Sequence, residues 1–210
     1  MRLSVEKTRH ASGWRKNARE KFGTERADIV IEETNALYER LCAESSGIPP
    51  EKREHMYKNI YPLAALYMTL RRYAGDDALS LAREWFIESV KMQANGLRKY
   101  ISDNDMAASF PKTFADEMRR TYSCEAGFEI EFITENSFET RFNVYSCLYH
   151  DVCASMGIPE LCRIFCLSDE VCYSELHESL HWSRTQTLAY GSYCDFGMRY
   201  KATDTGACGE

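Results

Sequence analysis

The residue types best suited to chemistry gather toward the C-terminal end of this chain. Six of its nine cysteines lie between Tyr145 and Cys194, interleaved with histidines and aspartates. Thiols and imidazoles serve as nucleophiles, proton carriers and metal ligands, whereas a protein core needs neither group. We therefore expect the chemistry of this protein in that region.

The first pattern in this region pairs a cysteine with a histidine. Cys147 and His150 are three residues apart at a point where a predicted strand gives way to a predicted helix. A helix N-terminus favours the thiolate form of a cysteine, and His150 can serve as an acid, a base or a ligand. The same spacing is also typical of a thiol packed under a sheet and a histidine in solvent.

The second pattern places two thiols and a carboxylate on one helical face. Cys162 and Cys166 are four residues apart, and Asp169 follows three residues later. This spacing suits a nucleophile beside a carboxylate, or a metal site, and equally two core thiols followed by a capping aspartate. For Cys162 we favour the core.

Cysteines from separate elements can also converge on a metal ion. Cys147, Cys166 and Cys194 are candidates, although the chain lacks the Cys-x-x-Cys pairs of most structural zinc sites. His177 and His181 have the spacing of a zinc-binding helix, but the segment has strand character, so we expect no metalloprotease.

The bulk composition excludes several classes of partner. The chain has 210 residues and a net charge of −6, so we expect no nucleic-acid partner, because phosphate binding needs a basic surface. It has no apolar stretch of transmembrane length and no apolar segment at its start, which predicts a cytoplasmic protein with no membrane partner. In that reducing compartment most of the thiols should be free.

The hydrophobic pattern changes period along the chain and predicts an α+β fold. It predicts a solvated basic N-terminal arm over 1–24, a helical region over 25–123, an α+β Cys-rich region over 124–201 in the same compact domain, and a disordered tail over 202–210. After Gly127, two alternating runs around 135–137 indicate one hairpin, and a second surrounds Gly191. We expect a C-terminal antiparallel sheet of about four strands, with short helices between the two hairpins.

Three local features of the helical half are predicted from single residues. Pro62 should kink or split the helix that contains it. The helix that begins at Ala78 should end at about Val90. A further helix should begin at Asn104–Asp105 and run to Tyr122.

Taken together, the C-terminal motifs resemble those of a known family. Four segments carry the likeness: Tyr-Ser-Cys-Leu-Tyr-His, Gly-Ile-Pro-Glu-Leu, Cys-x-x-x-Cys-x-x-Asp, and Thr-Gln-Thr-Leu-Ala-Tyr-Gly-x-x-Cys-Asp-Phe. Their order resembles that of the L-2-amino-thiazoline-4-carboxylic acid hydrolases, and the helical Ala65–Arg71 segment supports the likeness. Gly197 departs from the family pattern, in which a larger and often basic residue is usual.

The resemblance implies opening of a cyclic isothiourea: water adds at C2 of the 2-aminothiazoline ring and gives N-carbamoyl-cysteine. Such a reaction needs a nucleophile, a proton donor for the leaving group and a carboxylate to hold the amidinium. The candidate residues are Cys166 or Cys147 as nucleophile, with Cys194 in a third family-like motif, His150 as acid/base, Asp169 or Asp195 as amidinium partner, and Arg184 and Thr187 for substrate binding.

Two further readings compete with a hydrolase. The Gly-x-x-Cys-x-Phe close is faintly similar to 4-vinyl-reductase-type sensor domains, which implies a non-catalytic small-molecule-binding module, with zinc held by cysteines. The cysteine excess alone is also typical of a redox or metal-handling protein. For both the hydrolase and the binding module, the expected partner is a small molecule. The sequence assigns no cofactor and no oligomeric state.

Overall fold

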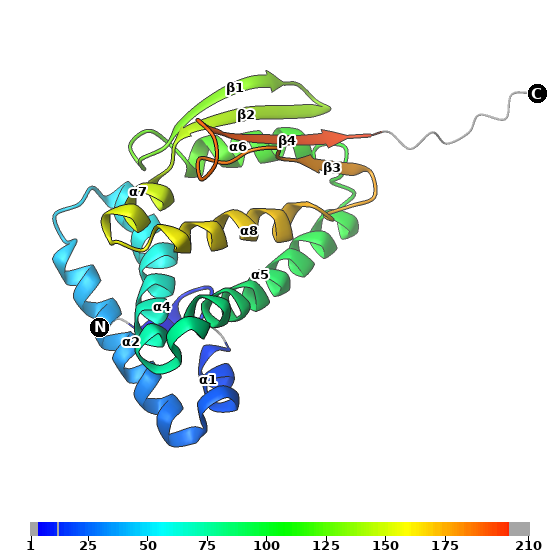
Figure 1. Cartoon of the computed structure of the whole chain (residues 1–210). Coiled ribbons are helices and arrows are strands. Elements are labelled where there is room, and N and C mark those ends of the chain that lie inside the picture. Colours follow the sequence, from blue (N-terminus) through cyan, green and yellow to red (C-terminus); the bar gives the residue numbers. More distant parts are fainter. Residues whose placement is uncertain (1–3, 12, 202–210) are drawn as a thin grey trace, which may run out of the picture.

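The structure is a computed structural model that describes residues 4–11 and 13–201 (Figure 1). Its α-helices are α1 (Trp14–Phe22), α2 (Thr24–Glu44), α3 (Pro50–His55), α4 (Tyr61–Ala74), α5 (Ala78–Asp103), α6 (Phe110–Thr121), α7 (Leu148–Ser155) and α8 (Cys162–Tyr173). Its strands are β1 (Glu129–Glu135), β2 (Glu139–Ser146), β3 (Leu180–Ser183) and β4 (Cys194–Tyr200). Short 3₁₀ turns cover Val5–Lys7, Gly75–Asp77 and Pro159–Leu161, and a π-helical turn covers Met56–Ile60.

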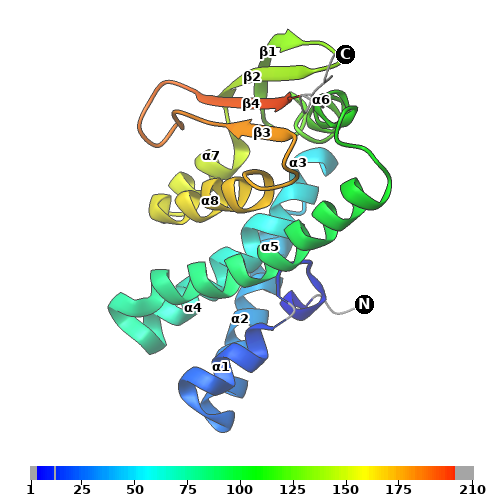
Figure 2. The same cartoon turned by 90° about the vertical axis from the view of Figure 1, so that its right-hand side faces the viewer.

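The elements are arranged in layers below an open sheet. The four strands lie at one end of the molecule, with α8 beneath them, then α5 and α4, and α2 and α1 at the far end (Figures 1 and 2). Helix α6 packs against β2 and β4, and α8 packs against α5. The predicted α+β fold, with a helical N-terminal half and a C-terminal antiparallel sheet, is confirmed.

The sheet has the strand order β1-β2-β4-β3 and is antiparallel throughout. Alternation places Phe142 opposite Phe196 and Val144 opposite Cys194 on the inner face, and the rings of Phe142 and Phe196 stack with centroids 5.0 Å apart. The intervening residues of β2 face outward: Arg141 and Tyr145 are exposed, and Asn143 is half-buried. One apolar face and one polar face are what an antiparallel sheet covered on one side requires.

Helices α3 and α4 form one continuous rod in spite of Pro62. The π-helical turn Met56–Ile60 joins them, and Pro62 falls in the first turn of α4. The Tyr61 amide donates to the Met56 carbonyl, five residues back, so the hydrogen bonds change to the wider π spacing just before the proline, which has no N–H to donate. The interruption expected at Pro62 thus takes the form of a π-helical turn that ends two residues before it.

Helices α5 and α6 have other bounds than those predicted. Helix α5 runs past Val90 to Asp103, because Ala94 and Ile101 continue its buried face. The chain then reverses at Asp105, which adopts a positive φ of 50°, so the next helix begins only at Phe110.

The N-terminal residues are not a solvated arm in the described part of the chain. Val5 is 0% exposed, and Trp14, in α1, is 1% exposed. The Val5 amide also donates to Asn35 of α2 at 2.8 Å. Val5 and Trp14 pack on the helical core, and the many basic residues around them made this segment look solvated in the sequence. The tail expected over 202–210 lies outside the described residues.

Candidate functional site

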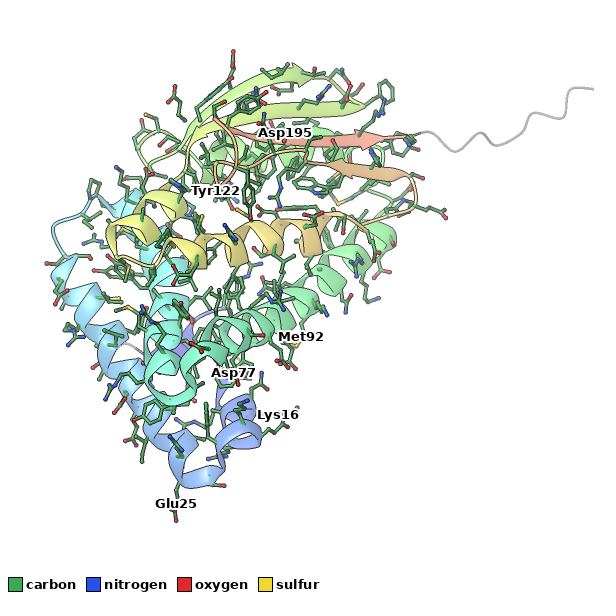
Figure 3. The ribbon with its side chains drawn as sticks, in the orientation of Figure 1. Lys16, Glu25, Asp77, Met92, Tyr122 and Asp195 are labelled. Carbon is green, nitrogen blue, oxygen red and sulfur yellow. The ribbon has the colours of Figure 1, made fainter. Side chains whose placement is uncertain are left out.

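A cavity of about 480 Å³ lies where the two hydrophobic clusters of the protein meet. Tyr122, Ile130 and Cys147 pack against both clusters and also line the cavity. Further lining residues come from the inner face of the sheet, α8, α5, the π-helical turn and the N-terminal segment. Tyr122 is labelled in Figure 3 between the sheet and α8.

Within this cavity an arginine and an aspartate form a partly buried ion pair. Arg184 donates from Nη1 to Asp169 Oδ2 at 3.1 Å, and from Nη2 to the Cys166 carbonyl at 2.7 Å and to Glu170 Oε2 at 3.3 Å. Its side chain is only 6% exposed. The guanidinium therefore links the loop after β3 to the cavity side of α8.

The Asp169 carboxyl faces the cavity and is otherwise enclosed by protein. Its side chain keeps 34% of its surface accessible, and it lines the cavity. Burial raises the pKa of Asp169 to about 6, although the Arg184 guanidinium acts in the opposite direction. The carboxyl is thus mostly ionised at neutral pH, but its charge is less stable than that of a solvated aspartate.

Cys166 is the cavity thiol best placed to ionise. The Cys162 thiol, one turn earlier in α8, donates toward its sulfur and lowers the pKa of Cys166, with a smaller contribution from Arg184. The same interaction raises the pKa of Cys162, which stays a thiol and is buried, as expected for a core residue. The spacing of one helical turn therefore places the Cys162 thiol, as donor, beside the Cys166 sulfur, as acceptor.

The other two candidate cysteines also line the cavity, but they hold their protons more tightly. Cys147 is the N-cap of α7, as expected from its sequence position. Burial nevertheless raises its pKa to about 12, against the effect of the Tyr149 and His150 amides. Burial likewise raises the pKa of Cys194 to about 11, and its sulfur accepts from the Leu188 amide at 3.2 Å.

Three other candidates lie away from the cavity lining. The His150 side chain is 41% exposed, and its Nδ1 lies 3.2 Å from Asp151 Oδ1. Asp195 accepts from the Thr185 amide and hydroxyl and from the Gln186 amide, at 2.7–2.8 Å. The Thr187 carbonyl accepts from the Tyr190 and Gly191 amides at 2.9 Å. The latter two therefore shape the loop between β3 and β4.

A histidine that the sequence did not single out lines the cavity instead. His55 Nε2 lies 2.8 Å from the Thr121 carbonyl, and its Nδ1 lies 3.3 Å from the Tyr149 hydroxyl. A carbonyl only accepts, so in the neutral ring Nε2 carries the proton and Nδ1 accepts from Tyr149. Burial lowers the pKa of His55, although the Thr121 carbonyl opposes this, so the ring is a neutral base. No sequence motif points to it, because it is set apart only by its place at the end of α3, next to the π-helical turn that the structure shows.

No three His, Cys, Asp or Glu side chains in the described ranges lie close enough together to hold a metal ion. Cys147, Cys166 and Cys194 thus share one cavity without forming a ligand cluster. His177 and His181 do not form a helical zinc pair, because His181 is in β3 and the Ser179 amide donates to His177 Nδ1 at 3.1 Å. None of the described helices has the length and apolar character needed to cross a membrane.

Fold and cavity together define an α+β protein with a cavity between sheet and helices that is lined by several thiols. The family of L-2-amino-thiazoline-4-carboxylic acid hydrolases matches residues 53–198, more than half of the chain, so the chain belongs to that family. The match includes Cys166, Asp169 and Arg184, and also His55 and Tyr149. No curated protein and no solved structure matches the chain.

Proposed function

We propose that this protein hydrolyses L-2-amino-thiazoline-4-carboxylate, or a close cyclic isothiourea, to N-carbamoyl-cysteine. The observation that carries the proposal is the cavity of about 480 Å³ in which Cys166, with its lowered pKa, lies beside the Asp169–Arg184 pair. Such a volume is typical of small-molecule sites. Membership of the hydrolase family supports the same chemistry.

In the proposed reaction the Cys166 thiolate attacks C2 of the ring, and the C2–S bond breaks. Water then attacks the same carbon and releases Cys166 as a thiolate. The oxygen of water becomes the urea oxygen, one of its protons ends on the ring nitrogen, and the other ends on the released sulfur. The Asp169 carboxylate, on the same face of α8, is suited to hold the amidinium during both steps.

Protons in this scheme move through Tyr149 and His55. The Tyr149 hydroxyl lines the cavity and donates to His55 Nδ1 at 3.3 Å, so it can take a proton from water while passing its own to the imidazole. The Thr121 carbonyl, 2.8 Å from Nε2, then stabilises the imidazolium. This pair takes the acid/base role expected of His150, whose exposed ring lies outside the cavity lining.

The test is turnover of the thiazoline by protein purified in reductant, with the product identified by mass spectrometry as substrate plus one water. We expect Cys166→Ala to abolish turnover and Cys124→Ala, at an exposed cysteine outside the cavity lining, to retain it. Full activity in Cys166→Ala would exclude that thiol as nucleophile. Saturable binding without product would favour the non-catalytic binding module instead.

A further inference from the structure

The cavity contains two permanent positive charges among its described lining residues, Arg9 and Arg184. A carboxylated ligand needs a cation that is free to receive it. Arg184 meets this need poorly, because three of its five N–H donors already bind Asp169, Glu170 and the Cys166 carbonyl, and two of these acceptors are carboxylates. A ligand carboxylate beside this guanidinium would be repelled by the carboxylates of Asp169 and Glu170, which lie 3.1 and 3.3 Å from it.

Arg9 is in the opposite situation. It makes no hydrogen bond or ion pair with any residue in the described ranges, and its side chain is exposed at the cavity lining. Its charge acts on other lining residues: burial, together with the charge of Arg9, lowers the pKa of His10 to about 4. Burial raises the pKa of Cys172 to about 11, and Arg9 opposes that rise.

The segment that carries Arg9 is anchored on both sides. Val5 is fully buried and donates its amide to Asn35 of α2 at 2.8 Å, and Trp14 is buried at the start of α1. Next to Arg9, the His10 ring lies 4.5 Å from the Phe86 ring, and Gln93 Nε2 lies 3.1 Å from its Nδ1. In Figure 2 this dark blue segment lies against α5 and α2. The backbone that carries Arg9 is therefore held beside the cavity by packing on both sides.

We propose that Arg9 is the carboxylate-binding residue of the cavity and selects ligands that carry a small-molecule carboxylate. This inference rests on the proposed function for the identity of the ligand, the C4 carboxylate of the thiazoline, but not for the existence of the subsite. Arg9 lies outside residues 53–198, which match the family. The segment before the family match thus supplies the discrimination, while α8 supplies the reacting groups.

The first experiment compares turnover of the carboxylated thiazoline with that of 2-amino-2-thiazoline, which lacks the carboxylate. In Arg9→Ala we expect kcat/KM for the carboxylated compound to fall about tenfold through KM, because a charge-assisted hydrogen bond is lost. The neutral compound should be unaffected, Arg9→Lys should restore most of the loss, and Arg83→Ala, at an exposed α5 arginine outside the cavity lining, should match wild type. Equal effects on both compounds, or none, would overturn the proposal.

The second experiment does not depend on hydrolysis. Cys172 lines the cavity and experiences the charge of Arg9, so its alkylation by iodoacetate, an anion, is compared with that by neutral iodoacetamide. Both reagents react with the same thiolate, so a change in the pKa of Cys172 cancels in the ratio of the two rates. We expect Arg9→Ala to lower this ratio about fivefold, as for an exposed charge, and Arg83→Ala to leave it unchanged. If wild type turns over neither thiazoline, the proposed function fails and this ratio alone decides the subsite: an unchanged ratio would refute it.

Discussion

The Asp169 carboxyl should cost the protein stability at neutral pH. Burial raises its pKa from 3.8 to about 6, so the folded state favours the protonated form. At about 1.4 kcal/mol per unit, this shift corresponds to about 3 kcal/mol of lost stability once the group is ionised. Because 34% of the side chain is accessible in the cavity, screening reduces the expected cost to about 1–2 kcal/mol.

The sign of the pH dependence follows from the direction of the shift. A group whose pKa is higher in the folded state contributes fully below its unfolded pKa, and that contribution is lost as pH rises through the folded pKa. Asp169→Asn mimics the protonated carboxyl at every pH. We therefore expect the variant to be more stable than wild type by about 1–2 kcal/mol at pH 7.5, with a difference near zero at pH 4.

Thermal unfolding followed by circular dichroism at pH 4 and 7.5 measures this difference. For a chain of this length it corresponds to a rise in Tm of about 3–6 °C at the higher pH. Asp195→Asn is the matched control: burial raises the pKa of Asp195, but hydrogen bonds from Thr185 and Gln186 lower it on balance. That variant should lose about 1 kcal/mol at pH 7.5. If Asp169→Asn is also destabilised there, the ion pair with Arg184 outweighs burial and our reasoning is refuted.

Three further outcomes are expected. Cys162→Ala should slow iodoacetamide alkylation of Cys166 at pH 7 several-fold, because it removes the donor that lowers the pKa of Cys166; an unchanged rate would argue against that donor. Tyr149→Phe should lower kcat by about a hundredfold with little change in KM, since it breaks the proton path to His55, and steady-state kinetics would reveal an unaltered kcat if the path is not used. Trp14→Ala should lower the free energy of unfolding by about 3 kcal/mol in urea titrations, whereas a solvated arm would give no change.

Local sequence patterns located the first hairpin but not the strand order, and β3 ends at Ser183, well before the Gly191 around which the second hairpin was expected. Alternation in 128–132 and 138–144 identified the first hairpin, because the side chains of a half-buried strand must alternate between core and solvent. The central pairing of β2 with β4 joins segments separated by two helices. No local pattern encodes it, since it depends on how the inner faces pack over α6 and the cavity.

The same distinction separates the site residues that could be predicted from those that could not. Cys166 and Asp169 lie on one face of α8, and their i, i+3 spacing is enough to bring them together. His55 and Tyr149 are 94 residues apart and meet only because α7 packs beside the π-helical turn. His150 was predicted from its spacing to Cys147, but spacing does not reveal that its ring faces Asp151 and solvent.

The family-like segment over residues 185–196 contains residues that support the site from outside the cavity. Asp195 accepts three hydrogen bonds from Thr185 and Gln186, which directly follow Arg184 in the chain. An aspartate in β4 thereby fixes the start of the loop from which the Arg184 guanidinium reaches Asp169 and the Cys166 carbonyl. Loss of Asp195 should accordingly affect chemistry at α8 through the position of Arg184. We therefore expect Asp195 to act as a positioning residue, because it lies outside the cavity lining and holds the backbone next to Arg184.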